Sequence, residues 1–225
     1  MERRVRELSI DKCWYKEVCT QDCYKPCIRY LEMSYLMAHS NIPTALQMPK
    51  KLIPDKKDVS AFDKLAEIKS NIVEFVEQGN NVFIGGKSAG TGKTSWSIKL
   101  LLRYFDQVWP GNGFRTRGLF IHVPTFLLKC KDFNNKDADF EELKKNILTA
   151  DVVVWDDIAS TEISAYDYSQ LLSYIDGRCN ENRSNIYTGN IVDEKDMFKA
   201  LGAKLTSRIF SSSTERVIFQ GGDKR

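Results

Sequence analysis

A glycine-rich loop carries the residue types that bind the phosphates of a nucleotide. It reads Gly-Lys-Ser-Ala-Gly-Thr-Gly-Lys-Thr-Ser over residues 86–95, between a predicted strand and a predicted helix. Glycines at 90 and 92 let backbone N–H groups approach phosphates closely, and the start of the helix adds unpaired N–H groups. We expect Lys93 to reach the β- and γ-phosphates and the Thr94 hydroxyl to ligate Mg²⁺. The predicted ATP site comprises Ser88, Ala89, Gly90, Thr91, Gly92, Lys93, Thr94 and Ser95.

The entrance of this loop departs from the usual phosphate-binding pattern. Lys87 stands where a glycine is expected, five residues before Gly92, and the glycine falls one position earlier, at Gly86. The half of the loop that grips phosphate is intact, so we expect a change of shape at the entrance only.

A second segment, about 60 residues further along, ends in two adjacent carboxylates. The apolar run 150–155 is predicted to be a buried strand, and Asp156 and Asp157 follow it directly. We expect Asp156 to hold Mg²⁺, directly or through water, and Asp157 to orient or deprotonate the attacking water. Many ATPases have a glutamate in the second position, so the shorter aspartate predicts slower or more conditional hydrolysis.

Alternating strand and helix patterns are expected to position these two segments. The predicted strands are Asn81–Ile84, Leu119–Val123, Val152–Trp155, Asn185–Thr188 and Arg216–Phe219. Helical segments separate them, and one helix precedes them, with apolar residues recurring from Phe62 to Val76 before Gly79 ends it. Parallel strands joined by helical crossovers form a sheet that is covered on both faces. The predicted fold class is therefore α/β, with a five-stranded parallel sheet.

Composition and charge are those of an ordinary soluble protein. The 225 residues are 42% hydrophobic and 28% charged, and the net charge is +3. No apolar run approaches the roughly 20 residues that span a bilayer. The first residues lack the apolar core of a signal peptide, so we expect a cytoplasmic protein with no membrane partner. The charge neither demands nor excludes nucleic acid, which would have to bind at a local patch.

Four cysteines lie close together near the N-terminus: Cys13, Cys19, Cys23 and Cys27. Disulfides are improbable in the cytosol, so the cluster indicates a metal site, and four thiolates suffice for tetrahedral Zn²⁺. An iron–sulfur cluster stays open, since it also uses four cysteines. We expect a metal-binding module at 1–40 that ends in an amphipathic helix, an extended linker at 41–59, and the ATPase domain at 60–225.

Residues 40–225 resemble the AAA+ ATPases of the DnaC/DnaI type, which load replicative helicases, and above all their phage-encoded relatives. The run 185–190, Asn-Ile-Tyr-Thr-Gly-Asn, resembles the sensor-1 strand, and the resemblance implies that Asn190 helps to position the attacking water. The run 201–209 resembles the helix of the arginine finger, which makes Arg208 the candidate for acting on ATP bound by a neighbouring subunit. The closing Gly-Gly-Asp-Lys-Arg at 221–225 also matches the phage loaders, without an assigned role.

The resemblance also implies partners: a replicative DnaB-type helicase held by the N-terminal module, single-stranded DNA, and further copies of the chain assembled with ATP. Loaders of this type bind single-stranded DNA with a helical insertion after the second strand and with the segment after the acidic motif. The corresponding candidates are Lys129, Lys131, Phe133, Ser164 and Tyr166. Several acidic neighbours weaken the positive field there, and we expect Phe126, Leu127 and Leu128 to be core residues.

The sequence thus predicts an ATP-dependent loader of a replicative helicase onto single-stranded DNA in phage DNA replication. An IstB-type transposition ATPase shares the core motifs and would bind duplex DNA and a transposase instead. A third alternative is a non-hydrolysing adaptor that keeps ATP as a structural ligand.

Overall fold

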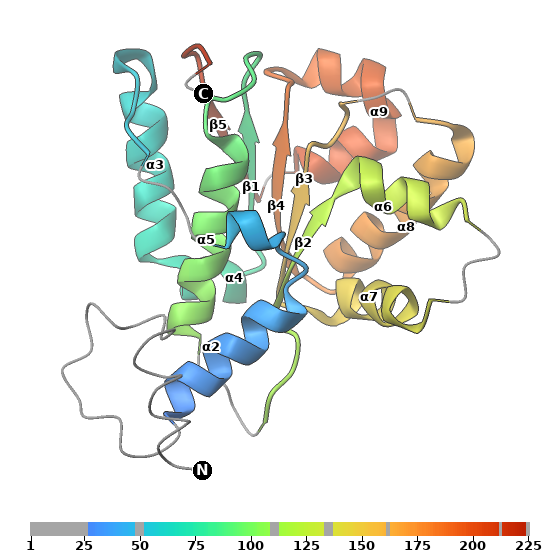
Figure 1. Cartoon of the computed structure of the whole chain (residues 1–225). Coiled ribbons are helices and arrows are strands. Elements are labelled where there is room, and N and C mark those ends of the chain that lie inside the picture. The colour runs from blue at the N-terminus through green and yellow to red at the C-terminus, as the bar shows by residue number, and fades with distance from the viewer. Residues whose placement is uncertain are drawn as a thin grey trace.

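A five-stranded parallel sheet forms the centre of the computed structural model, which describes residues 27–47, 52–108, 113–132, 137–160, 163–211 and 213–223. The strand order is β2-β3-β4-β1-β5 (Figure 1). The strands are β1 (Asn81–Gly85), β2 (Gly118–His122), β3 (Val152–Asp156), β4 (Ser184–Gly189) and β5 (Thr214–Ile218). All pairings between them are parallel. The predicted sheet and each predicted strand are confirmed, with bounds that differ by at most two residues.

Helices cover both faces of the sheet because the strand residues alternate between two apolar cores. Val82 and Ile84 face one core, and Phe83 between them faces the other. The first core holds α2 (Ile28–His39), α3 (Val59–Ser70), α4 (Ile72–Glu77) and α5 (Lys93–Gln107). The second holds α6 (Val123–Cys130), α7 (Ala138–Thr149), α8 (Ala165–Asn180) and α9 (Glu194–Ile209), on the right of Figure 1. No helix in the described ranges is long and apolar enough to span a membrane.

The helix predicted from Phe62 to Val76 is present but broken. Asn71 leaves the helical conformation, with φ −112° and ψ 29°, and separates α3 from α4. The apolar spacing continues across the break because both helices pack on the same core. Gly79 ends the second helix with a left-handed φ of 69°.

The described part of the N-terminal region packs directly on the helices that cover the sheet. Met33, Leu36 and Met37 of α2 and Ile42 after it belong to the same core as α5. The edge strand β2 is also covered, since Phe120 N–H donates to the Ser40 carbonyl and the Asn41 side chain donates to the Phe120 carbonyl. The boundary predicted at residue 40 thus falls within a continuous core. The division into 1–40, 41–59 and 60–225 stays a prediction, because residues 1–26 lie outside the described ranges.

The stretch predicted as an extended linker contains two short 3₁₀ helices, Thr44–Leu46 and Lys56–Asp58. Asp58 is fully buried, and its Oδ1 accepts hydrogen bonds from the backbone N–H groups of Gln220, at 2.7 Å, and Gly221, at 3.0 Å. The start of α3 is therefore tied to the C-terminal tail. This contact gives a structural role to Gly221 in the closing run, to which the sequence pattern assigned none.

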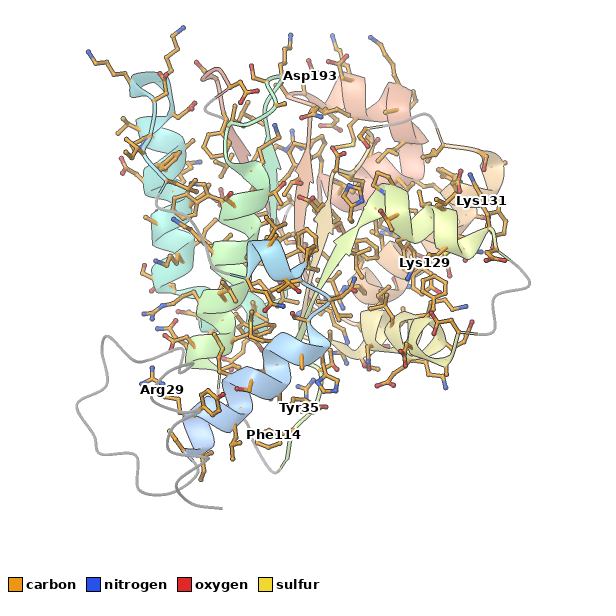
Figure 2. The ribbon with its side chains drawn as sticks, viewed as in Figure 1. Arg29, Tyr35, Phe114, Lys129, Lys131 and Asp193 are labelled. Atoms are coloured by element: carbon orange, nitrogen blue, oxygen red, sulfur yellow. The ribbon has the colours of Figure 1, made fainter. Side chains whose placement is uncertain are left out.

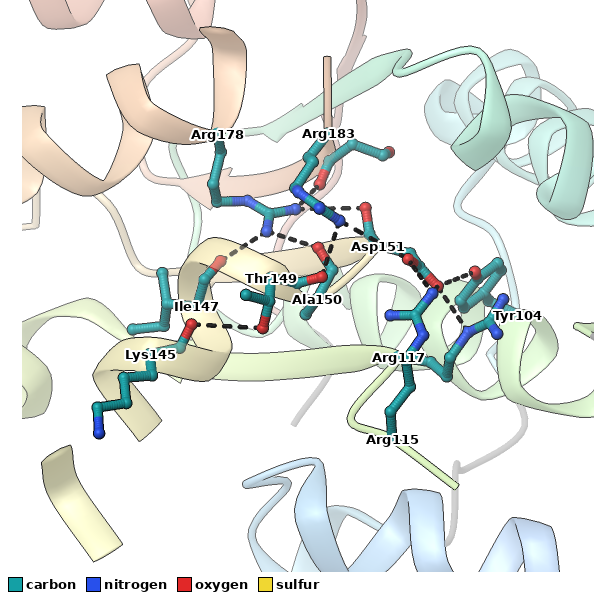
Figure 3. A network of polar contacts seen from close by, with 11 residues as sticks. Tyr104, Arg115, Arg117, Lys145, Ile147, Thr149, Ala150, Asp151, Arg178 and Arg183 are labelled. Atoms are coloured by element: carbon teal, nitrogen blue, oxygen red, sulfur yellow. Dashed lines mark hydrogen bonds and ion pairs between the residues drawn. The ribbon is translucent and has the colours of Figure 1, made fainter. Parts of the chain in front are cut away.

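A buried arginine forms hydrogen bonds that link the amino ends of β3 and β4 (Figure 3). Arg178 of α8 is fully buried and donates to the carbonyls of four residues and to the side chain of Asn185. Those carbonyls belong to Ile147, Ala150, Asp151 and Ser184. Burial lowers the pKa of Arg178 to about 9, so the guanidinium remains protonated at neutral pH. It fastens the end of α7 and the start of β3 to β4.

Candidate nucleotide site

The phosphate-binding loop has the predicted strand–loop–helix geometry. It leaves β1 after Gly85, and α5 begins at Lys93 with Gly92 as its N-cap residue. Gly90 and Gly92 have left-handed φ angles of 68° and 99°, which residues with a side chain rarely adopt. The free N–H groups at the start of α5 therefore lie next to a backbone that can turn toward bound phosphate.

The shifted glycine at the loop entrance has a steric cause. A Cβ at Gly86 would lie 2.8 Å from the backbone oxygen of Phe219. The Phe219 N–H in turn donates to the Gly85 carbonyl at 2.8 Å. The tail after β5 therefore runs against the loop entrance and leaves no room for a side chain at residue 86.

The Lys93 side chain is buried inside the loop. Its Nζ donates to the carbonyls of Gly86, at 3.1 Å, and Ser88, at 2.8 Å, and lies 3.4 Å from the Thr91 hydroxyl. The ammonium group is thus held by loop oxygens at the place where the motif puts phosphate oxygens. These neutral carbonyls are weaker partners for it than phosphate.

The two predicted magnesium ligands meet at the carboxyl edge of the sheet. The Thr94 hydroxyl donates to Asp156 Oδ1 at 2.8 Å, and the Thr188 hydroxyl of β4 donates to the same oxygen at 2.7 Å. Burial raises the pKa of Asp156, and the two hydroxyl hydrogen bonds lower it in part. A hydroxyl and a carboxylate are the hard oxygen ligands that Mg²⁺ takes beside phosphate and water. Thr94 and Asp156 therefore fit the predicted metal.

Thr188 is a site residue that the sequence analysis missed. Besides bonding Asp156, its hydroxyl accepts the Asp157 N–H at 3.0 Å, and its carbonyl accepts the Ile158 N–H at 2.8 Å. Asp157 itself has a left-handed φ of 59°, a conformation that costs about 1 kcal/mol or more for a residue with a side chain. A signal was available: Thr188 ends the predicted strand Asn185–Thr188, and the carboxyl ends of parallel strands lie at the same edge of a sheet, where Asp156 was also expected.

The other two predicted catalytic residues lie further out. Asn190 directly follows β4 and is exposed. Arg208 lies in the second half of α9, beyond a kink at Gly202, and its Nε donates to Asp176 Oδ1 of α8 at 2.6 Å. Its side chain is 47% exposed in a cleft of about 430 Å³ that Lys204 also lines. The catalytic roles of Asn190 and Arg208 stay predictions.

The structure brings the predicted DNA-binding segments together at α6 and the start of α8. Lys131 pairs with Asp167 at 2.8 Å, and the Tyr166 hydroxyl donates to the Cys130 carbonyl at 2.8 Å. Ser164 caps α8 in a reciprocal capping box with Asp167. These contacts explain Ser164 and Tyr166 structurally as well, so DNA binding by them stays a prediction.

The remaining predictions for this region concern Lys129, Phe133 and the apolar run 126–128. Lys129 Nζ lies 5.6 Å from the centre of the Phe140 ring, and Figure 2 shows both lysines on α6 and just after it. Phe133 lies outside the described residues. Phe126 and Leu127 are buried as predicted, but Leu128 is 70% exposed, so its assignment to the core was wrong. The helix is short and turns this one position of the apolar run toward solvent.

Only one of the four predicted zinc ligands lies in the described ranges. Cys27 is a half-buried thiol immediately before α2. Cys13, Cys19 and Cys23 lie outside the described residues, and among those described no group of three or more His, Cys, Asp or Glu side chains is arranged to hold a metal. The zinc or iron–sulfur site stays a prediction.

Solved structures share this fold, although no protein-family model and no curated protein matches the chain. The DnaC helicase loader matches with a TM-score of 0.64 at 23% identity, over 79% of this chain and 100% of that chain. DnaI matches with a TM-score of 0.63 at 17% identity, over 80% and 95%. AMPPCP-bound DnaA from Aquifex aeolicus matches with a TM-score of 0.58 at 15% identity, over 76% and 51%. The predicted resemblance to DnaC and DnaI is confirmed at the level of the fold.

Proposed function

We propose that the chain is an ATP-dependent loader of a replicative, DnaB-type helicase onto single-stranded DNA in phage DNA replication. The observation that carries the proposal is that the Thr94 hydroxyl, at the start of α5, and the Thr188 hydroxyl both donate to the Asp156 carboxylate. This arrangement stands on a fold that matches the DnaC helicase loader over that whole chain. The fold supports the loader class, and the site supports the use of ATP within it.

In this proposal ATP replaces the internal partners of Lys93. The ammonium exchanges the Gly86 and Ser88 carbonyls for β- and γ-phosphate oxygens, which are stronger partners because they are charged. Thr94 and Asp156 hold Mg²⁺, which neutralises charge on the phosphates when it is bound. Asp157, fixed through its N–H to Thr188, orients the attacking water together with Asn190.

Hydrolysis in this proposal needs a second copy of the chain. Arg208 lies at the surface and pairs with an exposed carboxylate, Asp176. Exposed pairs of this kind contribute at most about 1 kcal/mol, so the guanidinium can exchange Asp176 for a phosphate of the neighbouring subunit. The homo-oligomer therefore forms with ATP at its interfaces.

DNA and helicase are assigned to separate parts of the chain. Lys129, Lys131, Phe133, Ser164 and Tyr166 are the proposed single-strand contacts at α6 and α8. The adjacency of these two helices, through the Lys131–Asp167 and Tyr166–Cys130 contacts, supports a shared surface. The N-terminal cysteines hold Zn²⁺ or an iron–sulfur cluster and present the helicase-binding module.

The test combines two substitutions on opposite sides of one nucleotide. Lys93→Ala should abolish ATP binding, whereas Arg208→Ala should leave ATP binding by the monomer intact and reduce hydrolysis by up to roughly 10³-fold. Mixing the two variants should restore part of the activity, since an intact loop then meets an intact arginine. Lys199→Ala on the exposed surface of α9 is the matched control. Normal turnover by Arg208→Ala, with no effect of mixing, would exclude an ATP site shared between two subunits.

A pull-down separates the loader from its alternatives. A hexameric replicative helicase should co-purify with the full chain, and phosphate release should respond to single-stranded DNA. Co-purification without any phosphate release would indicate the ATP-bound adaptor. Preference for duplex DNA and a transposase, with no helicase recovered, would indicate the transposition ATPase.

A further inference from the structure

A stack of three aromatic rings joins α2 to the segment before β2. The His39 and Tyr35 rings are stacked with their centres 4.0 Å apart and an interplanar angle of 27°. Tyr35 also stacks on Phe114, which precedes β2, at 5.2 Å and 22°. Phe114 is 50% exposed at the end of this stack, and Figure 2 shows it beside Tyr35 below α2. An exposed phenylalanine held parallel to a second ring offers a flat apolar face.

Three arginines share the carboxylate of Asp151, and the first of them directly follows Phe114 in the chain. Arg115, the residue after Phe114, bonds Asp151 at 2.8 Å, and Arg117 reaches the same side chain at 2.6 Å (Figure 3). Arg183 is the third, at 3.8 Å. The arginine side chains are 49%, 17% and 30% exposed, so Arg115 is the most accessible. One carboxylate neutralises one of the three charges, which leaves an excess of positive charge.

The other charged groups that face these arginines reduce the excess only in part. Glu32 on α2 lies near Arg117; burial raises the pKa of Glu32, and the charge of Arg117 lowers it in part. At the other end of α2, Arg29 and Arg103 likewise share one carboxylate, Asp106. Among these groups, arginines outnumber carboxylates at both ends of α2.

We infer that Tyr35, His39, Phe114, Arg115, Arg117 and Arg183 form a binding surface for single-stranded nucleic acid, here called the α2–β2 surface. A base would stack on Phe114, and the adjacent arginines would contact the phosphates on either side of it. Aromatic faces beside arginines are the combination that binds single strands without sequence preference. A duplex keeps its bases stacked inside, so the rings favour a single strand over duplex DNA.

The α2–β2 surface is separate from the proposed contacts at α6 and α8. Figure 2 shows Lys129 and Lys131 on a different side of the molecule from Tyr35 and Phe114. The inference rests on the proposed function only for the choice of ligand. It adds a second binding surface for single-stranded DNA. This surface lies near the amino ends of the β-strands, whereas Asp156 lies at their carboxyl ends.

The test measures the anisotropy of a labelled oligo-dT of about 20 nucleotides with the full chain. Phe114→Ala should weaken binding at least about fivefold, and Phe114→Trp should restore it because the ring is kept. Arg115→Ala should weaken binding and reduce the slope against salt by about 0.7, the value for one phosphate contact on a single strand. Phe198→Ala, which removes a ring that is 55% exposed on α9, is the matched control and should bind normally.

Two outcomes would overturn the inference. One is oligo-dT affinity equal to that of the unsubstituted chain for both Phe114→Ala and Arg115→Ala. The other is an equal loss of oligo-dT and duplex binding by Phe114→Ala, which would exclude stacking. If Phe114→Ala does not fold, Phe114→Trp and Arg115→Ala decide the question. ATP binding and helicase co-purification are measured on the same variants, so that failure of the surface is distinguished from failure of the loader proposal.

Discussion

Thr188→Val tests whether the Thr188 hydroxyl stabilises Asp156 and Asp157 at the carboxyl edge of the sheet. The substitution keeps the shape and removes the hydroxyl, which bonds the Asp156 carboxylate at 2.7 Å and accepts the Asp157 N–H at 3.0 Å. A hydrogen bond to a charged group contributes about 1.5–3 kcal/mol, and a neutral one about 1 kcal/mol. Valine regains part of this through its extra methyl group. We expect a net loss of about 2–3 kcal/mol in the free energy of unfolding at pH 8.

The loss should also depend on pH, with a defined sign. Burial already raises the pKa of Asp156, and the Thr188 hydroxyl lowers it in part, so Thr188→Val raises this pKa further. The folded variant then binds a proton more tightly than the folded parent does. Its deficit in stability should therefore shrink as the pH falls from 8 toward the pKa of Asp156, where the lost bond is to a neutral carboxyl group.

The assay is urea unfolding of the nucleotide-free chain at several pH values, with Thr206→Val as the matched control. The Thr206 hydroxyl is buried and has no hydrogen-bond partner among the described residues. The same chemical change there should be neutral or stabilising at every pH. Equal losses for the two variants, or a loss by Thr188→Val that does not change with pH, would refute the reasoning.

The remaining predictions concern other parts of the chain. Arg178→Met should lower the free energy of unfolding by at least about 3 kcal/mol in urea titration, because it leaves several buried carbonyls without a donor; a small loss would show that water replaces it. Gly221→Ala should cost about 1–3 kcal/mol, since its Cβ would lie 2.4 Å from Asp58 Oδ2, whereas Gly222→Ala meets no atom within 4 Å and should cost little. Metal analysis should find about one zinc per chain, and Cys19→Ser should lose the metal and helicase binding while keeping ATP binding; a folded, metal-free parent chain would end that proposal.

Local sequence patterns were sufficient for the sheet and the nucleotide loop. The apolar strands, the Gly-Thr-Gly-Lys-Thr run and the carboxylates after β3 depend on neighbouring residues, so they could be recognised without the fold. The contact between Thr94 and Asp156, 62 residues apart, also followed from them, because the carboxyl ends of all strands in a parallel sheet lie at one edge.

Sequence patterns were less reliable where the same residue type is compatible with two different positions or roles in the fold. Leu128 continues an apolar run, yet it is exposed because α6 buries only one side. Ser164 and Tyr166 match expected DNA contacts, but within the chain they cap α8 and hold α6. A hydroxyl at a helix start suits either role, and sequence position alone does not decide between them.

Tertiary structure alone decided the contacts between distant segments. Asp58 accepts the N–H of Gln220, 162 residues away; Thr188 bonds Asp156, 32 residues away; and Tyr35 stacks on Phe114. Nothing around either partner specifies the other, since a carboxylate, a hydroxyl or a ring accepts many neighbours equally well. The choice is made when the sheet and helices pack and bring particular groups into contact, and for the polar groups it matters because a buried one without a partner costs about 1–3 kcal/mol.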